Sequence, residues 1–78
     1  MEKYWNDLAK RNLLGKTIKS VRYMTKSEAE NMGWESRALA IFFTDGSFIF
    51  PSMDDEGNDG GALFGRTKDG EDLTFPVL

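Results

Sequence analysis

The 78-residue sequence contains neither cysteine nor histidine. The chain can therefore form no disulfide and no Cys/His zinc site, and it cannot supply a Cys–His pair or a Ser–His–Asp triad. Any metal ion would need oxygen ligands. No apolar run is long enough to predict a membrane span. The first ten residues, MEKYWNDLAK, are charged and amphipathic, so we expect no signal peptide and a cytoplasmic protein.

The length and composition predict one small folded domain over residues 1–78. Hydrophobic residues make up 40% of the chain and charged residues 29%, which is typical of a globular protein. A domain of this size buries only about 60% of the surface that its unfolded chain exposes. We therefore expect modest stability.

The formal net charge is −3, but the two parts of the chain differ in sign. Residues 1–30 carry seven Lys or Arg against four Asp or Glu, a net of +3, and residues 31–78 carry three against nine, a net of −6. A basic patch can bind nucleic acid. Scattered basic residues more often keep a sheet edge soluble, so nucleic acid is the distant alternative. Its candidate residues are Lys10, Arg11, Lys16, Lys19, Arg22 and Lys26, with Tyr23 as a stacking platform.

Two helices and one strand are predicted in the first half. Apolar residues at helical spacing and Gly15 predict a helix over residues 2–13. The segment 16–24 mixes β-branched and aromatic residues with charges and predicts a strand. A Thr-x-x-Glu motif follows, in which Thr25 or Ser27 can cap the start of a helix, and Gly33 can end it. This pattern predicts a short helix over about 26–32.

The strongest structural pattern is RALAIFFTDGSFIFP, two apolar runs joined by Asp45-Gly46. This pair predicts a hairpin with a two-residue type I′ turn, which places Phe43 opposite Phe48. In that register one face, expected to be the core, contains Leu39, Ile41, Phe43, Phe48 and Phe50.

The opposite face of the predicted hairpin is also apolar, because it carries Ala40, Phe42 and Ile49. An apolar patch of this kind usually needs a cover. The N-terminal helix is the favoured cover, and a second copy of the chain is the alternative. The protein is accordingly expected to be a monomer or a homodimer through the apolar sheet face.

Beyond the hairpin, Pro51 ends the strand and the segment LTFPVL can add a closing edge strand. Together these elements predict an α+β fold, with the N-terminal helix packed on a small antiparallel sheet of about three or four strands. The sheet is centred on a 38–43/47–50 hairpin.

The loop PSMDDEGNDGG, residues 51–61, holds four carboxylates and is the first candidate site. It fails the calcium-loop template in every register. An irregular Ca²⁺ or Mg²⁺ site made by Asp54, Asp55, Glu56 and Asp59 is an alternative, and so is a purely structural corner. We favour recognition of a basic partner surface. The candidate partner-binding residues are Asp54, Asp55, Glu56, Asn58, Asp59 and Trp34.

Residues 21–64 resemble a group of short uncharacterised bacterial and bacteriophage proteins. In that group a Gly-Trp pair precedes an Asp-Gly hairpin, followed by Pro-Ser-x-Asp-x-Glu-Gly-Asn and Gly-x-Leu-Phe. The matching residues begin at Gly33 and Trp34 and end at Leu63 and Phe64. The resemblance implies a recognisable pattern but no established activity.

Such a pattern can form a rigid corner. We expect Ser52 or Asp54 to cap backbone N–H groups, Asn58 to take a left-handed turn, and Trp34 to pack beneath the loop. Leu63 and Phe64 would then fasten the loop to the sheet.

The sequence therefore predicts a non-enzymatic interaction or regulatory protein. The most specific version of this prediction is a phage accessory factor that binds a host protein. We expect no catalytic residue, no bound metal and no cofactor.

Overall fold

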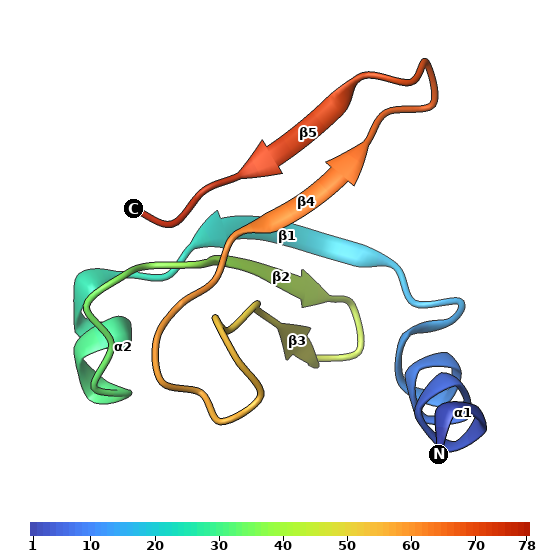
Figure 1. The fold of residues 1–78 in the computed structure, drawn as a ribbon, viewed down its shortest axis with the longest axis horizontal. Helices are drawn as coiled ribbons and strands as arrows, with labels where there is room; N and C mark the ends of the chain where they lie inside the picture. Colours follow the sequence, from blue (N-terminus) through green and yellow to red (C-terminus); the bar gives the residue numbers. More distant parts are fainter.

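A computed structural model describes residues 1–78 and contains two helices and five strands. Figure 1 shows their arrangement. The elements, in chain order, are α1 (Glu2–Leu13), β1 (Ile18–Tyr23), α2 (Lys26–Asn31), β2 (Leu39–Phe43), β3 (Phe48–Ile49), β4 (Leu63–Arg66) and β5 (Asp72–Phe75). The α+β class is confirmed. None of the helices is long and apolar enough to cross a membrane.

The strands form two antiparallel sheets. In the first, β2 lies between β1 and β3, and in the second β4 pairs with β5. The predicted closing strand thus pairs with β4 instead of joining the central sheet, as Figure 1 shows. The chain end does reach the central part of the fold, because Leu78 and Arg37 exchange two backbone hydrogen bonds of 2.9 and 3.0 Å.

The hairpin forms where it was predicted, but its register differs by one residue. Phe42 pairs with Phe48 and Ile41 pairs with Ile49, so the connecting loop has three residues instead of two. A type I′ turn needs a positive φ at both central residues, and only Gly46 has one, at 89°. The predicted turn type is therefore wrong.

A one-residue slip moves every side chain of a strand to the opposite face. The predicted single face of Leu39, Ile41, Phe43, Phe48 and Phe50 is accordingly wrong. Phe48 and Phe50 instead line the same hollow as Ala40 and Phe42. The rings of Phe42 and Phe48 lie 5.8 Å apart, and those of Phe48 and Phe50 stack at 5.9 Å. Three phenylalanines thus form one aromatic row on this face.

The N-terminal helix occupies the predicted residues but does not cover the sheet. No residue of α1 is buried, and α1 and α2 lie at opposite ends of the central sheet (Figure 1). The helix ends at an extended Leu14 followed by Gly15 with φ 78°, and this backbone leads the chain directly into β1. The predicted packing of the helix on the sheet is therefore wrong.

The core lies between α2 and the central sheet and is small. Its buried cluster comprises Met24, Ala29, Trp34, Ala38 and Ala40, with Phe42 and Phe50 packed against it. Only 8 of the 78 residues are buried. The stability of the domain therefore depends on few side chains.

Helix α2 begins at the predicted capping box. The Thr25 hydroxyl accepts from the backbone N–H of Glu28 at 3.1 Å, and the Glu28 carboxylate accepts from the backbone N–H of Thr25 at 2.8 Å. The guanidinium of Arg22 donates two further hydrogen bonds to this carboxylate, at 2.8 and 3.0 Å. The Arg22 bonds first, and the Thr25 bond second, lower the pKa of Glu28 from 4.5 to about 2.

This lowered pKa predicts acid sensitivity. A carboxyl group with a lower pKa in the folded state stabilises the fold above its ordinary pKa, and this contribution is lost as the pH falls through the folded value. We expect wild-type stability to fall between pH 4.5 and about 2, and Glu28→Gln to lose less over the same range. Urea denaturation followed by circular dichroism at each pH measures the effect. Glu30→Gln on the same helix is the control, and identical profiles for wild type and Glu28→Gln would contradict the assignment.

Candidate functional site

The base of the 51–61 loop is closed by backbone hydrogen bonds. The N–H of Gly61 donates to the carbonyl of Pro51 at 3.0 Å, and the N–H of Met53 donates to the carbonyl of Asp59 at 2.9 Å. Ser52 and Gly60 form an isolated antiparallel bridge between them. The two sides of the loop are therefore paired like a short piece of sheet.

Trp34 supports the loop from below. Its side chain is 4% exposed, and its indole N–H donates to the carbonyl of Gly57 at 2.7 Å. The ring also meets Phe50 edge-on, with centroids 5.6 Å apart. The sequence predicted Trp34 both beneath the loop and among the partner-binding residues. The buried ring agrees with the first position and leaves little surface for a partner, so Trp34 supports the loop.

Asp54 is used inside the loop. Its carboxylate accepts hydrogen bonds from the Asn58 side chain at 2.8 Å and from the backbone N–H groups of Asn58 and Glu56 at 3.3 and 3.0 Å. These bonds, with that of the Asn58 side chain first, lower the pKa of Asp54 below its ordinary value. Asp54 and Asn58 therefore form the internal frame of the loop.

Asp59 joins the loop to the segment between α2 and β2. Its carboxylate accepts from the backbone N–H of Ser36 at 3.0 Å and from that of Gly60 at 2.8 Å. The Ser36 bond first, and the Gly60 bond second, lower the pKa of Asp59. Asp59 is also only half-exposed. This carboxylate therefore ties the two segments together.

Asp55 and Glu56 differ from these neighbours. They lie in the turn at the tip of the loop and are exposed. Neither carboxylate accepts a hydrogen bond or forms an ion pair within the chain. The structure thus separates the predicted site residues into a frame, Asp54, Asn58 and Asp59 over Trp34, and two free carboxylates at the tip.

Two details of the predicted corner are wrong. The left-handed residue is Gly57, with φ 74°, because no residue other than glycine has a positive φ. Asn58 instead uses its side chain to bind Asp54. Leu63 is half-buried and lines a small hollow together with Ile41 and Ile49, as expected of a residue near the sheet. Phe64, however, is 77% exposed and does not fasten the loop.

The structure does not contain the cluster of ligands that the alternative, a cation site, would need. No group of three or more acidic side chains is arranged to hold a metal ion. The carboxylates of Asp54 and Asp59 are directed to N–H donors, which a cation would have to replace. The only loop carboxylates left for a cation are those of Asp55 and Glu56 at the tip.

The basic residues proposed for nucleic acid are partly engaged by the protein itself. The ammonium of Lys16 lies 3.0 Å from the carboxylate of Asp45 and donates to the Ser47 hydroxyl at 2.7 Å. The guanidinium of Arg22 binds Glu28 and lies over the Phe42 ring, 4.9 Å from its centroid. Two of the six candidates therefore have a structural role.

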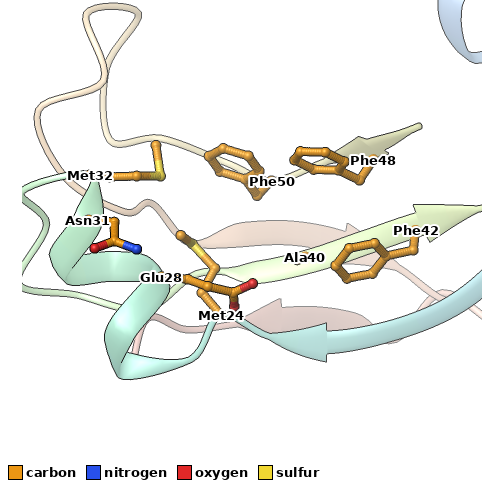
Figure 2. A pocket seen from close by; sticks show the side chains of 8 residues that line it. All are labelled: Met24, Glu28, Asn31, Met32, Ala40, Phe42, Phe48 and Phe50. Atoms are coloured by element: carbon orange, nitrogen blue, oxygen red, sulfur yellow. The ribbon is translucent and has the colours of Figure 1, made fainter. Parts of the chain in front are cut away.

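A second feature is an apolar hollow on the sheet face that the sequence predicted to be covered by the N-terminal helix or by a second copy of the chain. It lies between α2 and the aromatic row, has a volume of about 380 Å³, and is drawn in Figure 2. Its lining comprises Met24, Glu28, Asn31, Met32, Ala40, Phe42, Phe48 and Phe50. The sequence did indicate an apolar second face with Ala40 and Phe42. The three-residue turn adds Phe48 and Phe50 to that face and so enlarges it.

No family model, curated protein or solved structure matches this chain. The resemblance of residues 21–64 to short bacterial and bacteriophage proteins therefore stays a prediction.

Proposed function

We propose that this chain is a small non-enzymatic interaction protein that binds a basic surface of a protein partner through Asp55 and Glu56. The observation behind this proposal is that the carboxylates of the loop have two different roles. Asp54 and Asp59 hold the backbone in place, while the two carboxylates at the tip have no partner within the chain.

Preorganisation supports this proposal. A loop that is already ordered loses less conformational entropy on binding than a flexible one. Here the indole of Trp34, the Asp54 carboxylate and the paired base all restrict the loop before any partner arrives. Exposed Met53, next to the tip, adds an apolar contact to the charged ones.

Charge complementarity defines the partner. Two free carboxylates favour a surface rich in Lys or Arg, and such contacts raise the association rate and weaken as salt increases. Residues 31–78, which contain the loop, carry a net charge of −6 from three basic and nine acidic residues. The proposal extends to a cytoplasmic regulatory role, and to a phage accessory factor that acts on a host protein, on the basis of the sequence resemblance.

Affinity capture with matched variants tests the proposal. The test variant is Asp55→Asn/Glu56→Gln, which removes both free charges and leaves the frame intact. The control is Asp69→Asn/Glu71→Gln, which removes two exposed carboxylates from the turn between β4 and β5. We expect wild type and control to retain the same protein from lysate of the source organism, and the test variant to lose it.

Salt provides an independent check on the same capture. Because exposed charges are screened by salt, the retained protein should elute from wild type at a moderate salt concentration. Equal retention by the test variant and wild type would contradict the proposal. So would loss of the protein from the control variant alone, because that would place the contact on the other hairpin.

A further inference from the structure

The chain exposes more surface than a compact protein of its mass. Its accessible surface is 6138 Å², whereas a monomer of 8.8 kDa is expected to expose about 4,800 Å². Its radius of gyration is 13.7 Å, against about 11.5 Å for a compact domain of this length. The excess of roughly 1,300 Å² is within the area that one subunit of a stable homodimer buries.

The apolar hollow is one part of this excess. Figure 2 shows the rings of Phe48 and Phe50 side by side, the ring of Phe42 below Phe48, and Met24 and Met32 toward α2. Phe48 is 54% exposed and Met32 is 44% exposed. Methionine side chains adapt to the shape of an apolar partner. The hollow therefore has the lining of a groove that accepts an apolar helix face.

The α1 helix also contributes exposed apolar surface. Tyr4, Trp5 and Leu8 form an apolar stripe at helical spacing. Tyr4 is 52% exposed and Trp5 is 57% exposed, and their rings contact each other edge-on at 4.9 Å. A short amphipathic helix without a buried residue gains little stability from its own propensity. This helix therefore needs an apolar surface to cover its stripe.

The connection between α1 and β1 keeps the helix away from its own hollow. Only residues 14–17 join the two elements. The carbonyl of Thr17 accepts from the N–H of Thr44 at 3.0 Å, and Lys16 is bound to Asp45. These contacts anchor the connection at the hairpin turn, at the end of the sheet remote from α2 (Figure 1).

We propose that two copies of the chain associate, with α1 of each copy bound in the hollow between α2 and the aromatic row of the other. This arrangement has two identical contacts, as a two-fold symmetric dimer requires. The charges are compatible with this contact, because α1 carries three basic and two acidic residues, a net of +1, and Glu28 is the only charged residue that lines the hollow. The dimer does not rest on the function proposed for Asp55 and Glu56.

The mass in solution tests the dimer. Sedimentation equilibrium of wild type should give twice the chain mass of 8.8 kDa. Trp5→Ala, on the exposed helix, and Phe48→Ser, in the hollow, should each raise the dimer dissociation constant by at least about tenfold. Phe64→Ser is the matched control, since this 77% exposed ring lies on β4 outside the hollow. Circular dichroism checks that Trp5→Ala, Phe48→Ser and the control remain folded, and the mixing test uses only folded variants.

Mixing the two variants tests the specific pairing. A Trp5→Ala chain retains an intact hollow, and a Phe48→Ser chain retains an intact helix, so one productive contact can form between them. We expect the mixture to show more dimer than either variant alone, with one chain of each kind. A monomeric wild type would overturn the proposal, and so would a dimer that is lost only with Phe64→Ser. A mixture with no gain of dimer would overturn the helix-in-hollow contact.

Discussion

Trp34→Ala is expected to remove most of the stability of the domain. The indole is the largest side chain of a buried cluster with four other members, and truncating a buried tryptophan to alanine costs about 3–5 kcal/mol. Small domains are stable by about 5–15 kcal/mol, and one with so few buried residues is expected near the lower limit. Urea denaturation followed by circular dichroism measures the loss.

Two further variants separate the roles of Trp34. Trp34→Phe keeps an aromatic ring in the core but removes the hydrogen bond to the Gly57 carbonyl. We expect it to fold, with a loss of about 1 kcal/mol from that bond plus a smaller loss from packing. Phe64→Ala removes a ring that is 77% exposed and should be nearly neutral. If Trp34→Ala were as stable as Phe64→Ala, the core assignment would be wrong.

Gly61→Ala is expected to open the base of the loop. A Cβ atom on Gly61 would lie 2.6 Å from the carbonyl oxygen of Ser52 and 2.7 Å from its carbonyl carbon. Both atoms belong to the backbone, so the two sides of the loop must separate. Overpacking of this kind typically costs about 1–3 kcal/mol. Faster amide hydrogen exchange at Met53 and Gly61, the two donors of the base, would report the opening.

Gly65→Ala is the matched control for this substitution. It adds the same methyl group in β4, where the nearest atoms belong to the Leu73 side chain at 3.9 Å. We expect a neutral or slightly positive effect on stability, because alanine restricts the unfolded chain more than glycine does. Unchanged exchange at Met53 in Gly61→Ala would contradict the close approach at the base.

The parts of the fold that could be predicted from the sequence depend on local interactions. The capping box of Thr25 and Glu28 involves residues three apart and directly marks the start of α2. The residue range of α1 follows in the same way from helical spacing. The hairpin was also recognisable, since Asp45-Gly46 lies between two apolar runs.

The hairpin register, in contrast, could not be predicted from the sequence. Asp-Gly is compatible with a two-residue turn and also with a three-residue loop in which only the glycine has a positive φ. In the structure the N–H of Ser47 and its hydroxyl both donate to the Asp45 carboxylate, which also binds Lys16 from outside the hairpin. The contact with Lys16 spans many residues of sequence, so no local pattern reveals it.

For a related reason, the sequence could not predict where α1 lies or which carboxylates of the loop are free. An apolar stripe on a helix predicts a contact but does not identify the surface that provides it. Likewise, Asp54 and Asp55 are adjacent residues of the same type, and only the folded backbone brings N–H donors to the Asp54 carboxylate and none to that of Asp55. The contact of Trp34 with Gly57 likewise joins residues 23 apart.

The central claim is that the loop is ordered before any partner binds and that the side chains of Asp55 and Glu56 take no part in this order. Amide hydrogen exchange of the free protein, measured for wild type and Asp55→Asn/Glu56→Gln, tests it most directly. Slow exchange at Met53, Glu56, Asn58 and Gly60 in both proteins is the predicted result. Exchange as fast as that of an unstructured peptide in wild type, or protection that disappears in the variant, would contradict the claim.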